Sequence, residues 1–332
     1  MNIMMLAAGE GTRLRPHTNF LPKPAIPFLN IPLFVHSLNF LSEVKISKLV
    51  MNTFHLPERL KEKAAEYSFN FPVIFSDEIK TLLGSGGGLG NARTHFQDQE
   101  HFILVNGDEL IIPSRPGQLQ QALEHHKNNK NIATLLVMDH PEVGTKFGGV
   151  WTDDQNCILG FGKNKMEKAT RAHHNIGVMI FSREIFKYIP EGVSNILYDV
   201  LMSAIKDGKR AQSYSLSCLW FETGNSADFI LASKECLKLM SSADQNHQFE
   251  GNYLRQMIKL YSPSSKWIFD QEKSILFDSS SLLPLQNLTG FCVIGKNVYI
   301  HKDIKIKNSV IGNNLKLLGA EFIQDQLILN VS

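Results

Sequence analysis

Short apolar runs alternate with amphipathic stretches over the first two thirds of the chain. Runs that stop at glycine, asparagine or aspartate predict buried strands, and apolar residues three or four positions apart predict helices. The predicted strands are residues 3–7, 48–52, 72–75, 101–105 and 132–138, and the predicted helices are 34–41, 57–67, 90–96 and 118–127. This alternation predicts an α/β fold with a mainly parallel sheet, which binds ligands beyond the carboxyl ends of its strands.

The pattern changes after residue 147. Residues 148–182 favour strands, whereas 196–206 and 226–239 favour helices. The polar stretch that follows predicts a connector rather than a packed element. The predicted division is a large domain, a connector and a small domain, at residues 1–239, 240–264 and 265–332.

A six-residue period sets the tail apart from the rest of the chain. Two series of apolar residues have this spacing: Ile294, Ile300 and Ile306, and Val298, Ile304 and Val310. Such a period is typical of a β-helix made of short repeated strands. An antiparallel hairpin or meander is the alternative for so short a segment.

Composition narrows the class of protein. The 332 residues carry a formal net charge of +2, with 43% apolar and 20% charged residues, so nothing indicates a nucleic-acid partner or a membrane surface. The N-terminus is apolar only as far as Ala8, which is too short for a signal peptide. No run approaches the roughly 20 apolar residues of a membrane span. The four cysteines stand far apart, so we expect reduced thiols in a cytoplasmic protein.

The first predicted strand runs into a glycine loop with basic residues. Residues 6–16 read LAAGEGTRLRP and residues 22–24 read PKP. Glycine lets backbone N–H groups approach an anion closely, and Arg13 and Lys23 add positive charge for a polyphosphate. A bare GxG would indicate only a tight turn, whereas this longer pattern is specific. Leucine at position 14 excludes the GxGxxG loop of a dinucleotide-binding protein.

These motifs closely resemble the signature of the sugar-1-phosphate nucleotidyltransferases, LAAGxGTRLxPxT followed by PKP. The resemblance implies a Rossmann-like catalytic domain with a mainly parallel mixed sheet, followed by a short left-handed β-helix-like domain. It implies a nucleotide site made of Leu6, Ala8, Gly9, Gly11, Thr12, Arg13 and Lys23. In that site the backbone of residues 6–8 meets the base, and Lys23 approaches the α-phosphate. Residues 83–89, LGSGGGL, match a glycine loop of the family that contacts the base, which adds Gly86 and Gly87.

The resemblance also implies a metal site. Asp108, in Asn-Gly-Asp at a strand end, matches the aspartate of the family that binds Mg²⁺, although a solvated turn would have the same composition. Glu222 stands where the family has a second metal aspartate. We expect Glu222 to bind the metal too, with its longer side chain shifting the ion or weakening activity; the alternative is a structural carboxylate. Glu109 is expected to point elsewhere.

Three residues match the sugar-phosphate site of the family. Gly148 lies at the entry to a strand, Lys163 matches the lysine of a Glu-Lys-Pro motif, and Asn175 belongs to an Asn-x-Gly motif. The glutamate of the Glu-Lys-Pro motif is missing, because position 162 is glycine. This difference indicates an altered sugar pocket. An exposed loop lysine and an ordinary turn are the alternatives for Lys163 and Asn175.

The implied reaction joins a nucleoside triphosphate to a sugar 1-phosphate and releases pyrophosphate, with Mg²⁺ as cofactor and Arg13, Lys23 and Asp108 as catalytic residues. GTP with mannose or heptose 1-phosphate is the first choice, because the resemblance to guanylyltransferases covers the GEGTRLRP loop and the β-helix-like tail, whereas the glycine triplet fits the uridylyltransferases almost as well. UTP with a cell-wall amino-sugar 1-phosphate is the second. A non-catalytic paralogue that binds nucleotide-sugar is a third hypothesis. Glu222 in place of aspartate and Gly162 in place of glutamate favour it. Self-association through the tail is a further hypothesis.

Overall fold

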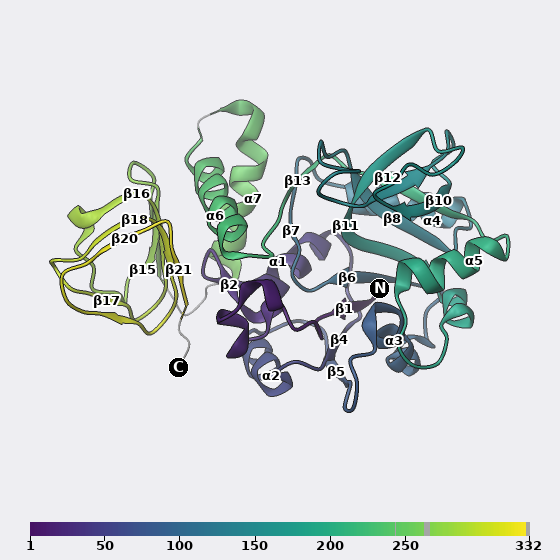
Figure 1. Ribbon diagram of the computed structural model, residues 1–332, viewed down its shortest axis with the longest axis horizontal. Coiled ribbons are helices and arrows are strands. Elements are labelled where there is room, and N and C mark those ends of the chain that lie inside the picture. Colours follow the sequence, from purple (N-terminus) through teal and green to yellow (C-terminus); the bar gives the residue numbers. More distant parts are fainter. Residues whose placement is uncertain (243, 262–265, 330–332) are drawn as a thin grey trace.

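The computed structural model describes residues 1–242, 244–261 and 266–329. An α/β domain with a twisted central sheet forms the larger part, and a stack of short strands forms the smaller part beside it (Figure 1). The central strands run in the order β10-β9-β11-β6-β1-β4-β5, with β8 paired to β11 and β12 paired to β8. Their bounds are β1 (Asn2–Leu6), β4 (Lys48–Thr53), β5 (Val73–Asp77), β6 (His101–Asn106), β8 (Ala133–Met138), β9 (Gly149–Thr152), β10 (Ile158–Gly162), β11 (Arg171–Ser182) and β12 (Ala211–Ser215).

The centre of this sheet is parallel. β1 pairs in parallel with β4 and β6, and β4 with β5, whereas β11 runs antiparallel to β6 and β8. Successive side chains of a strand point to opposite faces, and in β1 Ile3 and Met5 enter one apolar core while Met4 enters another. The predicted α/β fold with a mixed sheet is confirmed.

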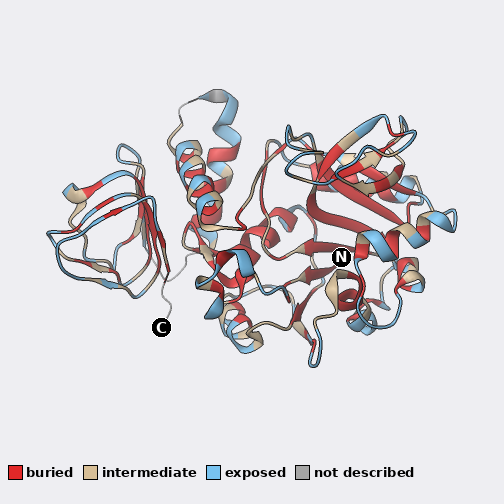
Figure 2. Cartoon of the chain, viewed as in Figure 1, coloured by how far each residue is buried: buried red, intermediate tan, exposed pale blue. Residues whose placement is uncertain are grey.

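Helices cover both faces of the sheet, with the buried strands between them (Figure 2). Apolar residues of α1, α2 and α4 join the first core, and those of α3 and α5 join the second. The bounds are α1 (Leu33–Phe40), α2 (Pro57–Ala65), α3 (Gly84–Asn91), α4 (Gln118–Asn128) and α5 (Met202–Lys206). A ribbon of β7 (Leu110–Pro113) and β13 (Cys218–Phe221) lies outside the main sheet. In the described part of the chain, no helix has the length and apolar character needed to cross a membrane.

The second glycine run is a helix, not the predicted loop. α3 begins at Gly84 and contains the whole run, where the sequence predicted a helix only from residue 90. Glycine is a poor helix former, but larger residues do not fit here. A Cβ on Gly86 would lie 2.7 Å from Ser194 Oγ, and one on Gly87 would collide with the Gly192 carbonyl oxygen. Close backbone approach therefore explains the composition.

The predicted connector also contains a helix. α7 (Gln248–Tyr261) packs against α6 (Ser226–Ser241) and buries Leu254, Met257 and Ile258. This three- and four-residue spacing is that of one helix face, so the polar composition of the stretch concealed a packed element. Residue 243 and residues 262–265 of the predicted connector lie outside the described residues.

The tail forms stacked parallel coils. β15 pairs in parallel with β16 and β16 with β18, and β18 pairs in parallel with both β20 and β21. Val293 pairs with Val310, and Val310 with Leu327, so each coil advances 17 residues, close to three six-residue units. Parallel pairing excludes the antiparallel alternative, although β14 and β15 form one antiparallel pair. The bounds are β14 (Trp267–Asp270), β15 (Ile275–Asp278), β16 (Leu288–Ile294), β17 (Tyr299–Ile300), β18 (Lys305–Ile311), β19 (Lys316–Leu317), β20 (Phe322–Gln324) and β21 (Leu327–Ile328).

Candidate active site

A cavity of about 390 Å³ opens at the carboxyl ends of β1, β4 and β6. The sequence predicted a ligand site at this edge of the sheet. All the residues predicted from the first glycine loop line it, together with Lys23 and Asp108. The full lining is Leu6, Ala7, Ala8, Gly9, Gly11, Thr12, Arg13, Lys23, Pro24, Asn52, Leu82, Gly84, Ser85, Asn106, Asp108 and Gly224.

The first glycine loop has a defined conformation. Gly11 adopts a left-handed backbone with φ of 60°, immediately before the short 3-10 helix Thr12–Leu14. Thr18 Oγ1 donates to the Gly11 carbonyl oxygen at 3.0 Å, and His55 Nε2 lies 2.6 Å from the Thr18 carbonyl oxygen. A Cβ on Gly11 would lie 2.9 Å from Thr18 Cγ2, so glycine is required by both backbone angle and space. Nothing near His55 in the sequence indicates that this residue supports the loop.

Lys23 and Asp108 form an ion pair inside the cavity. Lys23 begins the short helix Lys23–Ala25, and its Nζ lies 2.6 Å from Asp108 Oδ2. The residue is only 9% exposed, so its stem is held by packing while its charge faces the carboxylate. A fixed ammonium beside a carboxylate at a polyphosphate-sized cavity can attract a phosphate and a metal ion to adjacent positions.

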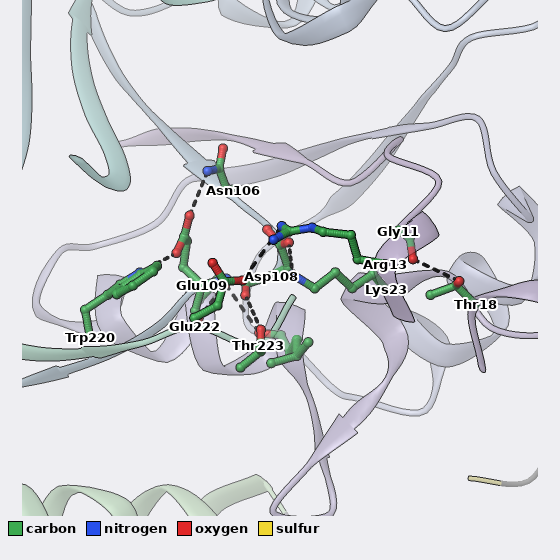
Figure 3. A network of polar contacts seen from close by, with 12 residues as sticks. Gly11, Arg13, Thr18, Lys23, Asn106, Asp108, Glu109, Trp220, Glu222 and Thr223 are labelled. Carbon is green, nitrogen blue, oxygen red and sulfur yellow. Dashed lines mark hydrogen bonds and ion pairs between the residues drawn. The ribbon is translucent and has the colours of Figure 1, made fainter. Parts of the chain in front are cut away.

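Glu222 lies beside this pair. Its Oε1 is 3.8 Å from a terminal nitrogen of Arg13, and the next residue, Thr223, donates from Oγ1 to the Asp108 carbonyl oxygen at 3.3 Å. Figure 3 shows Asp108 and Glu222 with Arg13 and Lys23 in one network of polar contacts. The Arg13 side chain is 66% exposed and that of Glu222 18% exposed, so we expect the arginine to leave the carboxylate readily for a phosphate.

The two carboxylates fit a magnesium ion. Mg²⁺ in phosphoryl-transfer sites is bound through one or two carboxylates, with phosphate oxygens and waters completing the octahedron. Asp108 and Glu222 carry carboxylates of this kind and are the residues that would hold such an ion; Asp108 lines the cavity, whereas Glu222 is not among its lining residues. Among the described residues, no group of three or more histidine, cysteine, aspartate or glutamate side chains could hold a metal by itself.

Glu109 points away from the cavity, in agreement with the prediction. Its Oε2 accepts from Trp220 Nε1 at 2.7 Å and its Oε1 accepts from Asn106 Nδ2 at 2.8 Å. Burial raises the pKa of the Glu109 carboxyl to about 7, with the neighbouring charge of Asp108 adding to the rise. A Cβ on Gly177 would collide with Glu109 Oε1, so the glycine of the Asn-x-Gly motif makes room for this carboxyl.

Gly86 and Gly87 do not line the cavity; Gly84 and Ser85 do. The N–H groups of Gly86 and Gly87 both point at the Ser194 carbonyl oxygen, at 2.8 and 3.4 Å. These amides are therefore occupied within the fold. The contribution of this run to the site comes from its first residues, two positions earlier than predicted.

The three predicted sugar-phosphate residues gather at one end of the paired strands β10, β9 and β11 of the central sheet. We call this end of the three strands the ribbon end. Gly148 precedes β9 and lies against Gly162, and Lys163 follows β10 with an exposed side chain. Asn175 sits at an irregularity of β11 and accepts from the Gly177 N–H at 3.1 Å. None of the three is among the described residues that line the 390 Å³ cavity.

Trp220, on β13, connects the ribbon end to Glu109, which follows Asp108 in the chain. Its ring lies 4.3 Å from that of His174 and 5.5 Å from that of Phe147, centroid to centroid, and its Nε1 donates to Glu109. Burial lowers the pKa of His174 to about 4, so this ring is neutral at physiological pH. Trp220 thus contacts both the aromatic residues at the ribbon end and Glu109, the residue that follows Asp108 in the chain.

Comparison with known proteins identifies the family. The profile of the family described as nucleotidyl transferase matches residues 2–238. A UTP–glucose-1-phosphate uridylyltransferase from Synechocystis is 31% identical over 69% of this chain and 61% of its own length. A mannose-1-phosphate guanylyltransferase from Mycobacterium tuberculosis is 24% identical over 96% of this chain and 81% of its own. The bifunctional protein GlmU from Methanocaldococcus jannaschii is 25% identical over 99% and 77%.

Solved structures agree on the fold. A UDP-glucose pyrophosphorylase complexed with UDP-glucose superposes with a TM-score of 0.61 at 20% identity, covering 71% of this chain and 98% of that one. HddC from Yersinia pseudotuberculosis superposes with a TM-score of 0.59 at 18% identity, covering 70% and 98%. The chain spans less than two thirds of the Synechocystis relative. The chain belongs to the nucleotidyl transferase family, among the sugar-1-phosphate nucleotidyltransferase enzymes.

Proposed function

We propose that the protein transfers a nucleotidyl group from a nucleoside triphosphate to a sugar 1-phosphate and releases pyrophosphate. The observation that carries this proposal is the Lys23–Asp108 pair, 2.6 Å apart, in a cavity walled by the glycine loop. The buried ammonium of Lys23 and the exposed guanidinium of Arg13 can bind the phosphates of two substrates. The carboxylates of Asp108 and Glu222 can bind a divalent ion beside those phosphates.

The reaction needs no covalent intermediate with the protein. An oxygen of the sugar phosphate attacks the α-phosphorus, a new P–O bond forms, and the bond to the β-phosphate oxygen breaks so that pyrophosphate leaves in line. The backbone of the Gly11 loop and Arg13 bind the triphosphate. Lys23 neutralises charge at the α-phosphate, where it increases in the transition state. Mg²⁺ held by Asp108 and Glu222 would supply further charge neutralisation.

Positioning accounts for the remainder of the catalysis. Two polyanions repel one another, and a fixed cavity holds them in contact. We assign the sugar phosphate to the ribbon end, where Lys163 offers an exposed cation and Asn175 offers an amide. In this arrangement the large domain carries all the chemistry, and the coiled tail is free to support self-association.

For the substrates, we propose guanylyl transfer to mannose or heptose 1-phosphate as the first pair to test. Relatives named as mannose-1-phosphate guanylyltransferases support it, one of them over 96% of the chain. Uridylyl transfer is the second pair, supported by the relative at 31% identity, which is named a uridylyltransferase.

The experiment is pyrophosphate release in the presence of Mg²⁺ over a grid of nucleoside triphosphates and sugar 1-phosphates. One productive pair, with the nucleotide-sugar confirmed by mass spectrometry, would establish the activity and both substrates. A folded protein that binds nucleotide but releases no pyrophosphate across the grid would overturn the proposal. Glu222 in place of aspartate favours that outcome, because the longer side chain alters the metal geometry.

A further inference from the structure

The two walls of the nucleotide cavity come from distant parts of the sequence, and a buried pair of side chains joins them. Ala7 and Ala8 form one wall, and Leu82, Gly84 and Ser85 form the other. We infer that Asn52 and Glu78 are positioning residues that hold these walls at the separation that a nucleotide requires. This inference rests on the proposed nucleotidyl transfer and adds two residues to its binding site.

Three hydrogen bonds connect the walls in series. Asn52 Oδ1 accepts from the Ala7 N–H at 2.7 Å, and Asn52 Nδ2 donates to Glu78 Oε1 at 2.7 Å. Glu78 Oε2 then accepts from the Leu83 N–H at 2.6 Å. Each carboxylate oxygen of Glu78 thus has its own donor, and the chain runs from the end of β1 to the start of α3 without a break.

Asn52 and Glu78 are buried, and burying the carboxylate of Glu78 is energetically unfavourable. Asn52 is 3% exposed and Glu78 6% exposed, and burying a charge is unfavourable unless hydrogen bonds replace the lost water. An apolar pair of the same volume would remove that cost but leave the Ala7 and Leu83 N–H groups unsatisfied. The arrangement therefore suits a role in which these two amides must be held in place.

The third glycine of the run makes room for the pair. A Cβ on Gly88 would lie 2.6 Å from Asn52 Nδ2 and 2.7 Å from Glu78 Oε1. α3 can approach the strand ends only because this position has no side chain. Because Asn52 accepts the hydrogen bond from the Ala7 N–H, this group does not serve as a donor to a bound base.

A reciprocal exchange tests the pair. Asn52→Asp places two carboxylates face to face, and Glu78→Gln removes one of the two acceptor oxygens, so each single change breaks the chain. In the double variant, the amide of residue 78 donates to the carboxylate of residue 52. All three hydrogen bonds return, and the net charge is that of the wild type.

We expect each single variant to raise the KM and the Kd for the nucleoside triphosphate about tenfold, since one buried hydrogen bond is lost. The KM for the sugar 1-phosphate should stay within about twofold, and the double variant should recover nucleotide affinity to within about threefold. Nucleotide affinity is measured by calorimetric titration and KM by pyrophosphate release. Asn131→Ala is the matched control, because Asn131 donates to Gln212 at 3.1 Å in another buried pair and should leave both KM values unchanged.

The outcomes separate this inference from the proposed function. Wild-type protein that binds no nucleoside triphosphate would overturn both. Wild-type binding with unchanged affinity in the single variants, or a folded double variant as weak as the singles, would overturn the pair alone. If a single variant does not fold, the double variant decides by itself: folding with near-normal nucleotide affinity supports the pair, and failure to fold overturns it.

Discussion

The two halves of the proposed site are built differently. On the nucleotide side, strand ends and the glycine loop converge, and buried hydrogen bonds through Asn52 and Glu78 hold the backbone in place. On the sugar side, Lys163 stands exposed at the end of a ribbon. A rigid half suits a triphosphate, whose shape is common to all nucleotides, whereas an open half suits a sugar that differs among relatives. The fold therefore suits the proposed nucleotidyl transfer to acceptors of different shape.

The largest expected effect is at Lys23. Lys23→Met keeps the buried stem but removes the charge beside Asp108, so kcat should fall on the order of a hundredfold to a thousandfold. Pyrophosphate release measures the loss, and circular dichroism checks that the variant is folded. Lys80→Ala, a change at an exposed lysine, is the control. Near-normal kcat in folded Lys23→Met would place the chemistry outside the nucleotide half.

Acid should destabilise the folded protein through His36. This side chain is fully buried on α1, and its Nε2 lies 2.9 Å from the carbonyl oxygen of Phe28, just beyond the segment that carries Lys23. Burial lowers the pKa of His36 to about 4, below the unfolded value of about 6.5. The unfolded chain therefore binds the proton more readily, and stability falls as the pH drops from about 6.5 to 4, by roughly 3 kcal/mol.

Urea unfolding at a series of pH values measures this loss. His36→Gln keeps a group that can bond to Phe28 but does not titrate, so its stability should depend less steeply on pH over that range. His247→Gln, at an exposed position, should keep the wild-type dependence. Equal slopes for wild type and His36→Gln would show that acid acts elsewhere in the protein.

Glu222 sits at the boundary between the halves, and its effect should be intermediate. Glu222→Ala should raise the Mg²⁺ concentration needed for half-maximal activity by about tenfold to a hundredfold, because one carboxylate ligand is lost. Activity measured over a Mg²⁺ titration tests this. Glu222→Asp, which restores the residue type expected from the family, should stay near or above the wild type. Unchanged Mg²⁺ dependence in Glu222→Ala would assign the carboxylate to holding Arg13 alone.

The sequence predicted the elements whose signals are local. The strands predicted at residues 3–7 and 101–105 and the loop at Gly11 follow from apolar runs that stop at a turn residue, and the structure places the ends of β1 and β6 and this loop at one cavity. The six-residue period predicted the coils because each repeat buries the same positions. The helical face at Leu254 and Met257 was present in the sequence too, but polar neighbours concealed it.

Non-local contacts could not be predicted in this way. Asn52 bonds to a backbone amide 45 residues away and to a side chain 26 residues away, and His55 bonds 37 residues away. Nothing near these residues in the sequence marks their partners. The glycine run was misassigned for the same reason, because the groups that exclude a side chain at Gly86 lie at Ser194 and Val200.

The smallest expected effect is at Lys163, and it tests the contrast between the halves most directly. Lys163→Ala should raise the KM for the sugar 1-phosphate about fivefold, since an exposed cation gains little from a phosphate in water. The KM for the nucleoside triphosphate should not change. Lys165→Ala removes a second exposed lysine two positions along and is the matched control.

Steady-state kinetics with each substrate varied in turn separates the two constants. If Lys163→Ala raised the KM for the nucleotide instead, the ribbon end would belong to the nucleotide half. The proposed division of the site into a nucleotide half and a sugar half would then be wrong. If Lys165→Ala had an equal effect on the sugar phosphate, the loop would act by its net charge rather than by a defined contact. A selective, modest loss at Lys163 alone is the result that an open acceptor half requires, because no buried network fixes that side chain.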